Sequence, residues 1–507
     1  MDTILLPDKY ADKLDGVLGC YDRLIVTGNL PELCYAKGMT SYLYRQGIRI
    51  FDYTAFAQPL RETLRTQAEE LAQANGITIE FIRKKDFRKE DRIQALLAQR
   101  GGQPGLVHIF SALEPCPSYQ PWHDKTTHQT YLKTASGKCL HYYFYFMDAE
   151  LGLCYLRVPT WCPFRLQFYC NGHAWLAHQL RAQGIAFQMC DNAFMHIDDY
   201  AAANRLAAQL DVKQLHAKLD EFARRYCPVV ATLNLSYQWN IWQAEYATDL
   251  VFKQAVDLQA FYPHLLETLI HAVKPADIAT FLGKKLHGNY QGELGSRFNV
   301  RRQGTRIKHQ MGPASLKMYD KFQQILRIET TVNDVTFFRQ YRQVHHRDGT
   351  TTTQWAPMPK TLYSLPALQE LLDAANHRYL KFISDIATPE VGVTALAALT
   401  QTQTEGQHRY KGFNLLADAE ATLFRVLLRG EFSISGFTNK ALRALLPNQT
   451  SAQISRLLRR LRVHHLVKKV GQRYKYYLTE LGRQVATMTL KLRELHVIPA
   501  LAHPETA

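Results

Sequence analysis

The sequence lacks the features that define several large classes of protein. It contains no run of about 18 apolar residues, so we expect no membrane span. Its N-terminus, MDTILLPDKYADKL, lacks the basic-then-apolar pattern of a secretion signal. The nine cysteines are scattered singly, without the close pairs of a zinc finger or a redox motif. Cys154, Cys162 and Cys170 are expected to be buried as small hydrophobic residues. These absences predict a cytoplasmic protein with reduced cysteines.

Negative charge is also scarce. The chain has 61 lysines and arginines against 45 acidic residues, a formal net charge of +16. Much of the excess lies in residues 284–327 and 456–493. A basic balance favours a polyanionic partner, because lysine and arginine neutralise phosphates. We therefore expect DNA as the partner, keep RNA as an alternative, and expect no membrane.

The pattern of elements predicts an α+β protein with three regions. Strands near 18–28, 77–82 and 105–110 alternate with helices, which indicates an N-terminal α/β domain over residues 1–115. Residues 116–400 form a central α+β region with an antiparallel sheet, and residues 401–507 a C-terminal domain. Three acids lie near N-terminal strand ends, where catalytic acids often lie, but surface or capping roles are favoured for them: Asp22, Asp52 and Glu114.

Two hairpins are expected in the central region. Residues 138–158 form an aromatic one, in which His141, Tyr143 and Tyr145 share a face. Those side chains either stack on bases or pack in a core, and we favour the core. Residues 345–353 are expected to form a polar hairpin tip.

Residues 301–334 predict three short antiparallel strands with one basic face. Turns at Gly312-Pro313 and Phe322-Gln323-Gln324 separate them. Apolar side chains alternate with the basic ones and should face a core. A polyanion suits the basic face, and an ordinary solvated face is the alternative. With the glycine-containing loop over 283–302, the predicted nucleic-acid contacts here are Lys284, Lys285, Arg301, Arg302, Arg306, Lys308, Lys317 and Arg327.

A further strand-like segment, Thr232 to Lys253, carries two acids on one side. Glu245 and Asp249 share a face whether the segment is a strand or a helix. Carboxylate oxygens are ligands that Mg²⁺ and Mn²⁺ prefer, so these two are candidate metal ligands. The alternative is a pair of surface acids that form ion pairs. His309 is a further possible ligand.

The C-terminal region predicts helices near 418–428, 437–446 and 450–464, a basic hairpin over 466–478 and a last helix. This order resembles a winged helix-turn-helix domain. The resemblance implies that the third helix enters the major groove and the wing contacts the backbone. It implies base contacts by Gln453, Ser455 and Arg456, and phosphate contacts by Arg459, Lys468, Lys469, Arg473 and Lys475. Winged helices also bind proteins or RNA, and those alternatives stay open.

The central stretch also resembles rolling-circle replication initiators of plasmids and filamentous phages. The resemblance rests on Tyr319-Asp320-Lys321 followed by Leu326-Arg327-Ile328-Glu329. It implies that Tyr319 is a nucleophile or positioning group on a DNA phosphate, Lys321 a phosphate ligand and Glu329 a ligand of Mg²⁺ or Mn²⁺. The chain departs from many such nickases because no strand carries a histidine–hydrophobic–histidine pair.

These observations predict a nucleic-acid-binding protein of a bacterial mobile element. The first hypothesis is a metal-dependent factor that nicks a DNA strand in replication or transposition. The alternatives are a non-enzymatic DNA-binding regulator and an RNA-binding component of a ribonucleoprotein.

Overall fold

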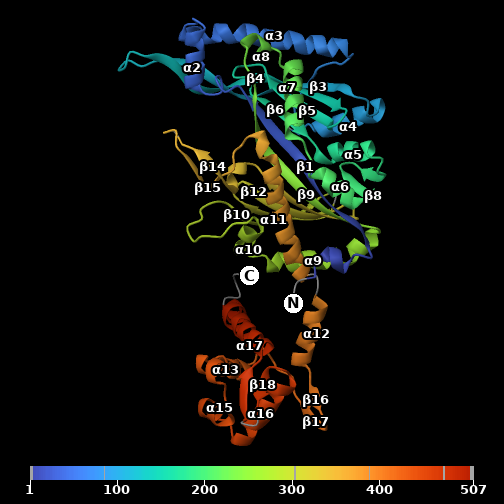
Figure 1. Cartoon of the computed structure of the whole chain (residues 1–507), viewed down its shortest axis with the longest axis vertical. Helices are drawn as coiled ribbons and strands as arrows, with labels where there is room; N and C mark the ends of the chain where they lie inside the picture. Colours follow the sequence, from blue (N-terminus) through green and yellow to red (C-terminus); the bar gives the residue numbers. More distant parts are fainter. Residues whose placement is uncertain are drawn as a thin grey trace. The chain divides into compact units, whose positions relative to one another are not determined.

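The computed structural model describes residues 4–84, 86–301, 304–346, 348–386, 389–471 and 474–502. The chain divides into two units, Met1–Ala387 and Thr388–Ala507 (Figure 1). Both combine helices with strands. None of the helices in the described ranges is long and apolar enough to span a membrane.

One eleven-stranded sheet runs through the first unit. All neighbouring strands are antiparallel except β2 and β3, which are parallel. In order across the sheet the strands are β10 (Leu294–Arg301), β11 (Gly304–Met311), β12 (Ala314–Lys321), β13 (Ile325–Val332), β9 (Gln238–Phe252), β1 (Leu14–Asn29), β6 (Leu166–Cys170), β5 (Gly152–Pro159), β4 (Thr130–Asp148), β3 (Gly105–His123) and β2 (Glu80–Phe81). Two separate hairpins are β7 (Phe187–Cys190) with β8 (Ala193–Ile197), and β14 (Arg339–His345) with β15 (Thr351–Pro357).

Helices cover both faces of this sheet. On one face, the apolar side chains of β12 and β13 pack with α9 and α11, as the burial of Met318, Ile328 and Tyr379 in one cluster shows. On the other, α5 and α6 pack on β1 around Leu18 and Cys20. The helices of this unit are α1 (Leu6–Lys9), α2 (Ala36–Arg45), η1 (Ile50–Asp52), α3 (Tyr53–Ala74), α4 (Lys89–Arg100), α5 (Gly172–Ala182), α6 (Tyr200–Ala207), α7 (Val212–Tyr226), α8 (Val229–Leu233), α9 (Ala255–Ala272), α10 (Pro275–Phe281), η2 (Val335–Phe337), η3 (Leu362–Ser364) and α11 (Leu365–Ile386).

The expected boundary at residue 115 is absent. It falls inside β3, which pairs along its length with β4, so residues 1–115 share one sheet with the central region. The expected loop over 283–302 also differs, because β10 occupies its second half and pairs with β11. The three strands expected between 301 and 334 are present as β11, β12 and β13. Alternation along a strand was readable from the sequence, but which strands become neighbours was not.

The second unit begins at Thr388, earlier than the expected boundary at residue 401. Leu399, near the end of α12, is buried in the core of this unit, which explains the difference. Its elements are α12 (Pro389–Thr400), β16 (Gln403–Glu405), β17 (His408–Tyr410), α13 (Asp418–Leu427), α14 (Gly430–Ser435), α15 (Asn439–Leu445), α16 (Ser451–Val463), β18 (Val467–Val470), β19 (Lys475–Leu478), α17 (Glu480–Leu492), η4 (Arg493–Val497) and α18 (Ile498–Ala502).

Within the second unit, α16 follows the expected pattern. Ile454, Leu458 and Leu461 are buried in the core, while Arg456 and Arg459 are exposed. A capping box fixes its start, because the Thr450 side chain accepts from the Gln453 amide and the Gln453 side chain accepts from the Thr450 amide. β18 and β19 pair as a two-stranded hairpin directly after it.

Candidate functional site

A β-bulge brings Asp22 onto the polar face of the sheet. The pairing of β1 with β9 shifts register between Tyr21 and Arg23, so Asp22 is an extra residue in the ladder. Bulges of this kind re-aim side chains. Arg23, which lies opposite Glu245, has its Nε atom 3.7 Å from a Glu245 oxygen. Asp22 is buried beside the same group.

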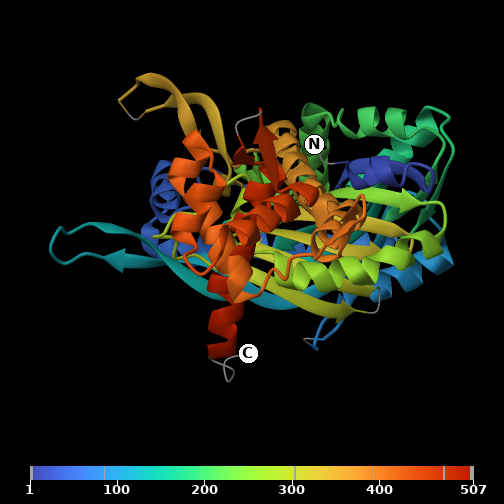
Figure 2. The same cartoon turned by 90° about the horizontal axis from the view of Figure 1, so that it is seen from below.

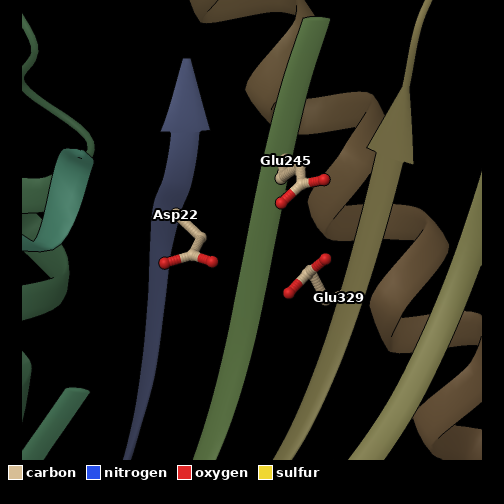
Figure 3. Close-up of side chains that lie close together, drawn as sticks. All are labelled: Asp22, Glu245 and Glu329. Atoms are coloured by element: carbon tan, nitrogen blue, oxygen red, sulfur yellow. The ribbon is translucent and has the colours of Figure 1, made fainter. Parts of the chain in front are cut away.

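Three carboxylates meet there, one from each of three neighbouring strands. Asp22 on β1, Glu245 on β9 and Glu329 on β13 each offer one oxygen, and these oxygens lie within 4.8 Å of one another. Figure 3 shows the three carboxylates close together on three adjacent strands. All three side chains are buried. The neighbours of Glu329 in sequence face the other way, as Thr330 does when it donates to Asn376 of α11. Three converging oxygen donors form a set that suits Mg²⁺ or Mn²⁺.

Lys317 and Tyr319 of β12 reach this group from the next strand. Lys317 lies opposite Glu329 in the sheet, and its ammonium contacts the carboxylates of Glu329 and Glu245, the latter at 3.4 Å. The Tyr319 hydroxyl donates to Glu329 Oε2 over 2.9 Å. Both side chains are partly exposed, whereas the carboxylates are buried. Lys317, Tyr319 and Glu329 therefore share one face of the sheet, and the tyrosine lies at the edge of the carboxylate group.

Arg327 and Asp249 form a buried ion pair beside the three carboxylates. The Arg327 guanidinium is fully buried and donates to Asp249 through Nε at 2.7 Å and Nη2 at 2.6 Å. Its Nη1 atom lies 3.4 Å from Asp22. Asp249 therefore serves as the counterion of Arg327 and lies outside the group of three, which corrects its assignment as a metal ligand. Arg327 likewise lies in the interior, so it does not present a surface contact for a phosphate.

Asp22 is held by three further groups that face it. The side-chain amides of Asn171 and Asn192 donate to Asp22 Oδ1, at 3.3 and 2.9 Å. His173 Nδ1 lies 3.2 Å from the same oxygen. Burial alone would raise the pKa of Asp22, but Arg327 and His173 hold it well below its usual range. Asp22 therefore stays ionised although it is buried.

The pKa values of the other two carboxylates are shifted in opposite directions. Burial and the charge of Glu329 raise the pKa of Glu245. Glu329 is also buried, but the Lys317 ammonium outweighs that burial and lowers its pKa. Burial and the Glu329 charge raise the pKa of the Tyr319 hydroxyl well above its ordinary value, so this phenol is neutral at physiological pH. Lys317 and Arg23 lower the pKa of Glu245, but by less than burial and the Glu329 charge raise it.

The other residues of the first unit that were predicted to contact nucleic acid lie in different environments. Burial lowers the pKa of Lys321 to about 8, and the side chain bonds to Asn192. Lys308 lies opposite Lys317, and burial together with that like charge lowers its pKa. Lys284 donates to the Phe337 carbonyl, and Lys285 is exposed. Arg306 lies opposite Tyr319. The Arg301 side chain and Arg302 lie outside the described residues.

In the second unit, the predicted DNA contacts are exposed but several have protein partners. Gln453 belongs to the capping box, and the Ser455 hydroxyl accepts from Asn439 at 2.9 Å. Arg459 lies 3.5 Å from Glu405. Arg456 and Arg459 line a cavity of about 640 Å³ beside α16. Lys468 and Lys469 are exposed on β18, Lys475 is partly exposed on β19, and Arg473 lies outside the described residues.

Sequence reasoning missed the role of three residues. Asp22 was expected at the surface or as a cap, but it is buried in the site; the available signal was an acid in the middle of a largely apolar strand. His173 and Asn192 come from segments far away in the sequence, and no local pattern marked them. His309, expected as a possible ligand, is buried on the other face against Tyr379 and Phe281. Asp52 pairs with Arg49 at the surface, and Glu114 pairs with Arg157.

Comparison of the chain with models of protein families, with curated proteins and with solved structures found no match, so the assignment of a function depends on the geometry of this site.

Proposed function

We propose that the chain nicks a DNA strand at the group formed by Asp22, Glu245 and Glu329, with Tyr319 as the nucleophile. The observation that carries the proposal is the convergence of three buried carboxylates from adjacent strands beside a tyrosine hydroxyl. The resemblance of the Tyr319-Asp320-Lys321 segment to rolling-circle initiators points to the same residue independently. The excess of 61 basic over 45 acidic residues fits a polyanionic substrate.

Three side chains have direct roles in this proposal. Tyr319 attacks the phosphorus atom, and its hydroxyl proton passes to Glu329, which already accepts that hydrogen bond. The new P–O bond links Tyr319 to one strand end. The broken P–O bond releases the other end as a hydroxyl, which takes up the proton that Glu329 received. Lys317 contacts the carboxylates from the more exposed side, where its charge also reaches a phosphate at Tyr319.

The residues present fit Mg²⁺ or Mn²⁺. Asp22, Glu245 and Glu329 would hold the ion, which would supply Lewis-acid polarisation of the phosphate. The raised pKa of Glu245 supports the fit, because burial and the neighbouring Glu329 charge both disfavour its ionised form when no cation is bound. The donors are oxygens throughout, as hard divalent ions prefer.

The second unit has features suited to bringing the protein to a DNA site. Helix α16 presents Arg456 and Arg459 beside the hairpin of β18 and β19, which carries Lys468 and Lys469. We propose a winged helix-turn-helix, with α16 in the major groove. The nine cysteines are free thiols, which supports a reducing, cytoplasmic setting for a factor of a bacterial mobile element.

A second candidate is a DNA- or RNA-binding protein without catalysis. The observation in its favour is the charge balance of the site. Lys317 bridges Glu245 and Glu329, and Arg327 neutralises Asp249 and Asp22, so ion pairs within the protein account for most of the charge. Buried networks of this kind also stabilise structure alone.

Metal binding and nicking separate these two candidates. We expect the protein to bind Mn²⁺ in calorimetry and to convert supercoiled circular DNA to the nicked form, with EDTA abolishing the conversion. Glu245→Gln should lose most of the Mn²⁺ affinity. Without metal it should unfold at a higher denaturant concentration than the wild type, because it removes the repulsion with Glu329.

Glu114→Gln provides the matched control, since Glu114 is a partly buried carboxylate of the same sheet that pairs with Arg157. This variant should bind Mn²⁺ as the wild type does. Wild-type protein that binds DNA but neither Mn²⁺ nor Mg²⁺, and that nicks no substrate, would exclude the enzyme and leave the second candidate.

Lys321 is buried and bonds to Asn192, so its charge would act on a bound phosphate through the field of the site, not by direct contact. That charge would still give DNA affinity a pH dependence. The Lys321 pKa of about 8 means that the ammonium is charged below pH 8 and neutral above it. DNA affinity, measured by fluorescence anisotropy, should therefore fall as pH rises from 7 to 9. In Lys321→Arg the side chain keeps its charge over that range, so the fall should disappear. An equal fall of DNA affinity in both proteins would show that a group other than Lys321 titrates over this range.

A further inference from the structure

The hairpin of β14 and β15 carries an exposed pair of aromatic rings. Tyr341 and Trp355 lie opposite each other in the ladder, and each is 61% exposed. Their ring centroids are 6.0 Å apart, with an angle of 57° between the planes. Large aromatic side chains normally bury most of their surface, and most of the aromatic contacts in this unit involve buried rings. An exposed pair of rings on a projecting element is therefore typical of a binding site.

The charge around these rings is positive. Residues 339–357 contain three arginines and a single acid, Asp348. That carboxylate already accepts from the backbone and hydroxyl of Thr350 at the tip. Arg339 lies on the same face as the rings and donates to the Trp355 carbonyl at 2.9 Å, while Arg342 donates to the Pro357 carbonyl at 3.2 Å. Both guanidinium groups are thus fixed to the hairpin.

The hairpin leaves the sheet directly after the strand that carries Glu329. β13 ends at Val332, η2 follows, and β14 begins at Arg339. Asn333, between them, accepts from Gln243 of β9, which ties this turn to the strand of Glu245. Figures 1 and 2 both show the hairpin projecting from the body of the first unit. Its rings are therefore carried on an arm that is rooted beside the carboxylate group.

We infer that this arm holds single-stranded DNA, with unpaired bases stacked on Tyr341 and Trp355 and phosphates near Arg339. Base–aromatic stacking needs a free ring face and nearby cations, and both are present here. Unpaired bases are available only in single strands, so the arm discriminates against duplex DNA. The inference rests on the proposed function for its choice of DNA, but it requires neither a metal nor cleavage.

The test is binding of a dye-labelled oligothymidylate by the full chain, in EDTA, followed by fluorescence anisotropy. The double variant Tyr341→Ala/Trp355→Ala should bind about thirtyfold more weakly, and each single variant about fivefold more weakly. Tyr341→Phe and Trp355→Phe keep a ring and should bind within about twofold of the wild type. Binding of a duplex of the same length should change little in all variants.

Trp122→Ala is the matched control. Trp122 is 44% exposed on the β3–β4 hairpin, but the Lys133 ammonium lies 3.4 Å from its ring centroid and covers it. Its loss should leave single-strand binding unchanged. Equal losses in Trp122→Ala and the double variant, or an unchanged affinity in the double variant, would overturn the inference. So would a change of oligomeric state in the double variant, because the rings would then contact a second copy.

The same experiment keeps this inference apart from the nicking proposal. If single-strand binding depends on the two rings as expected but the wild type never cleaves DNA, the inference about the arm is supported and the nicking proposal is excluded. If the protein nicks DNA but binds single strands equally well with and without the rings, the inference about the arm is excluded and the nicking proposal stands.

Discussion

Replacing Arg327 with methionine is expected to lower the free energy of unfolding by about 3–5 kcal/mol. The guanidinium is fully buried, donates twice to Asp249 and lies 3.4 Å from Asp22. Its removal leaves two buried carboxylates without their main counterion, and the desolvation cost of those charges is then no longer offset. Urea unfolding followed by circular dichroism measures the change.

The variant should also differ from the wild type in acid. Arg327 lowers the pKa of Asp249 in the folded state, so this group contributes stability above its unfolded pKa of about 3.9. That contribution is lost as pH falls below about 4. In Arg327→Met only His173 still lowers the pKa of Asp249, so the depression is smaller and the difference between the two proteins should shrink as pH falls.

Two comparisons show whether the effect comes from the buried charge. Arg327→Met/Asp249→Leu removes both partners and should recover a large part of the stability, because a buried pair can often be replaced by apolar groups. Arg225→Met removes a half-exposed partner of Glu221 and should leave the unfolding midpoint unchanged. A wild-type midpoint in Arg327→Met would show that water or other groups solvate the two carboxylates.

Local patterns predicted much of the strand content but not the site. Alternation along residues 304–332 gave both the strands and their two faces, as the burial of Leu316, Met318 and Ile328 on one side confirms. The same pattern could not show that the polar face is partly buried, because β7, β8 and α5 cover it from other parts of the sequence. His173 of α5 contacts Arg327, and Asn192, in the turn between β7 and β8, contacts Lys321.

The carboxylate group depends on contacts that span the whole first unit. Asp22 and Glu329 are more than three hundred residues apart, and β9 carries Glu245 between them in the sheet. The bulge at Asp22 shifts that residue out of the regular alternation, so period-two reasoning fails at the one position where the site needs it. Asp249 shares a face with Glu245, as expected, but it forms an ion pair with Arg327 and is therefore not part of the carboxylate group.

Tyr319→Phe is expected to abolish the covalent protein–DNA adduct and to slow nicking by roughly a thousandfold or more. The substitution removes only the hydroxyl, which is the attacking atom and the donor to Glu329 at 2.9 Å. The ring remains to fill its place between Arg306 and Arg327 in the ladder. The adduct is measured by denaturing gel electrophoresis with end-labelled DNA, and mass spectrometry of the digested adduct should place the nucleotide on Tyr319.

Tyr143→Phe controls for the loss of a tyrosine–carboxylate hydrogen bond. The Tyr143 hydroxyl donates to Glu114 at 2.6 Å in the same sheet, and burial raises its pKa, as it does for Tyr319. Both substitutions should cost a similar, small stability of about 1–2 kcal/mol. Only Tyr319→Phe should lose the adduct, because only that hydroxyl lies beside the three carboxylates. Nicking at the wild-type rate in Tyr319→Phe would assign the attack to water, and Tyr319 would then be a residue that positions Glu329.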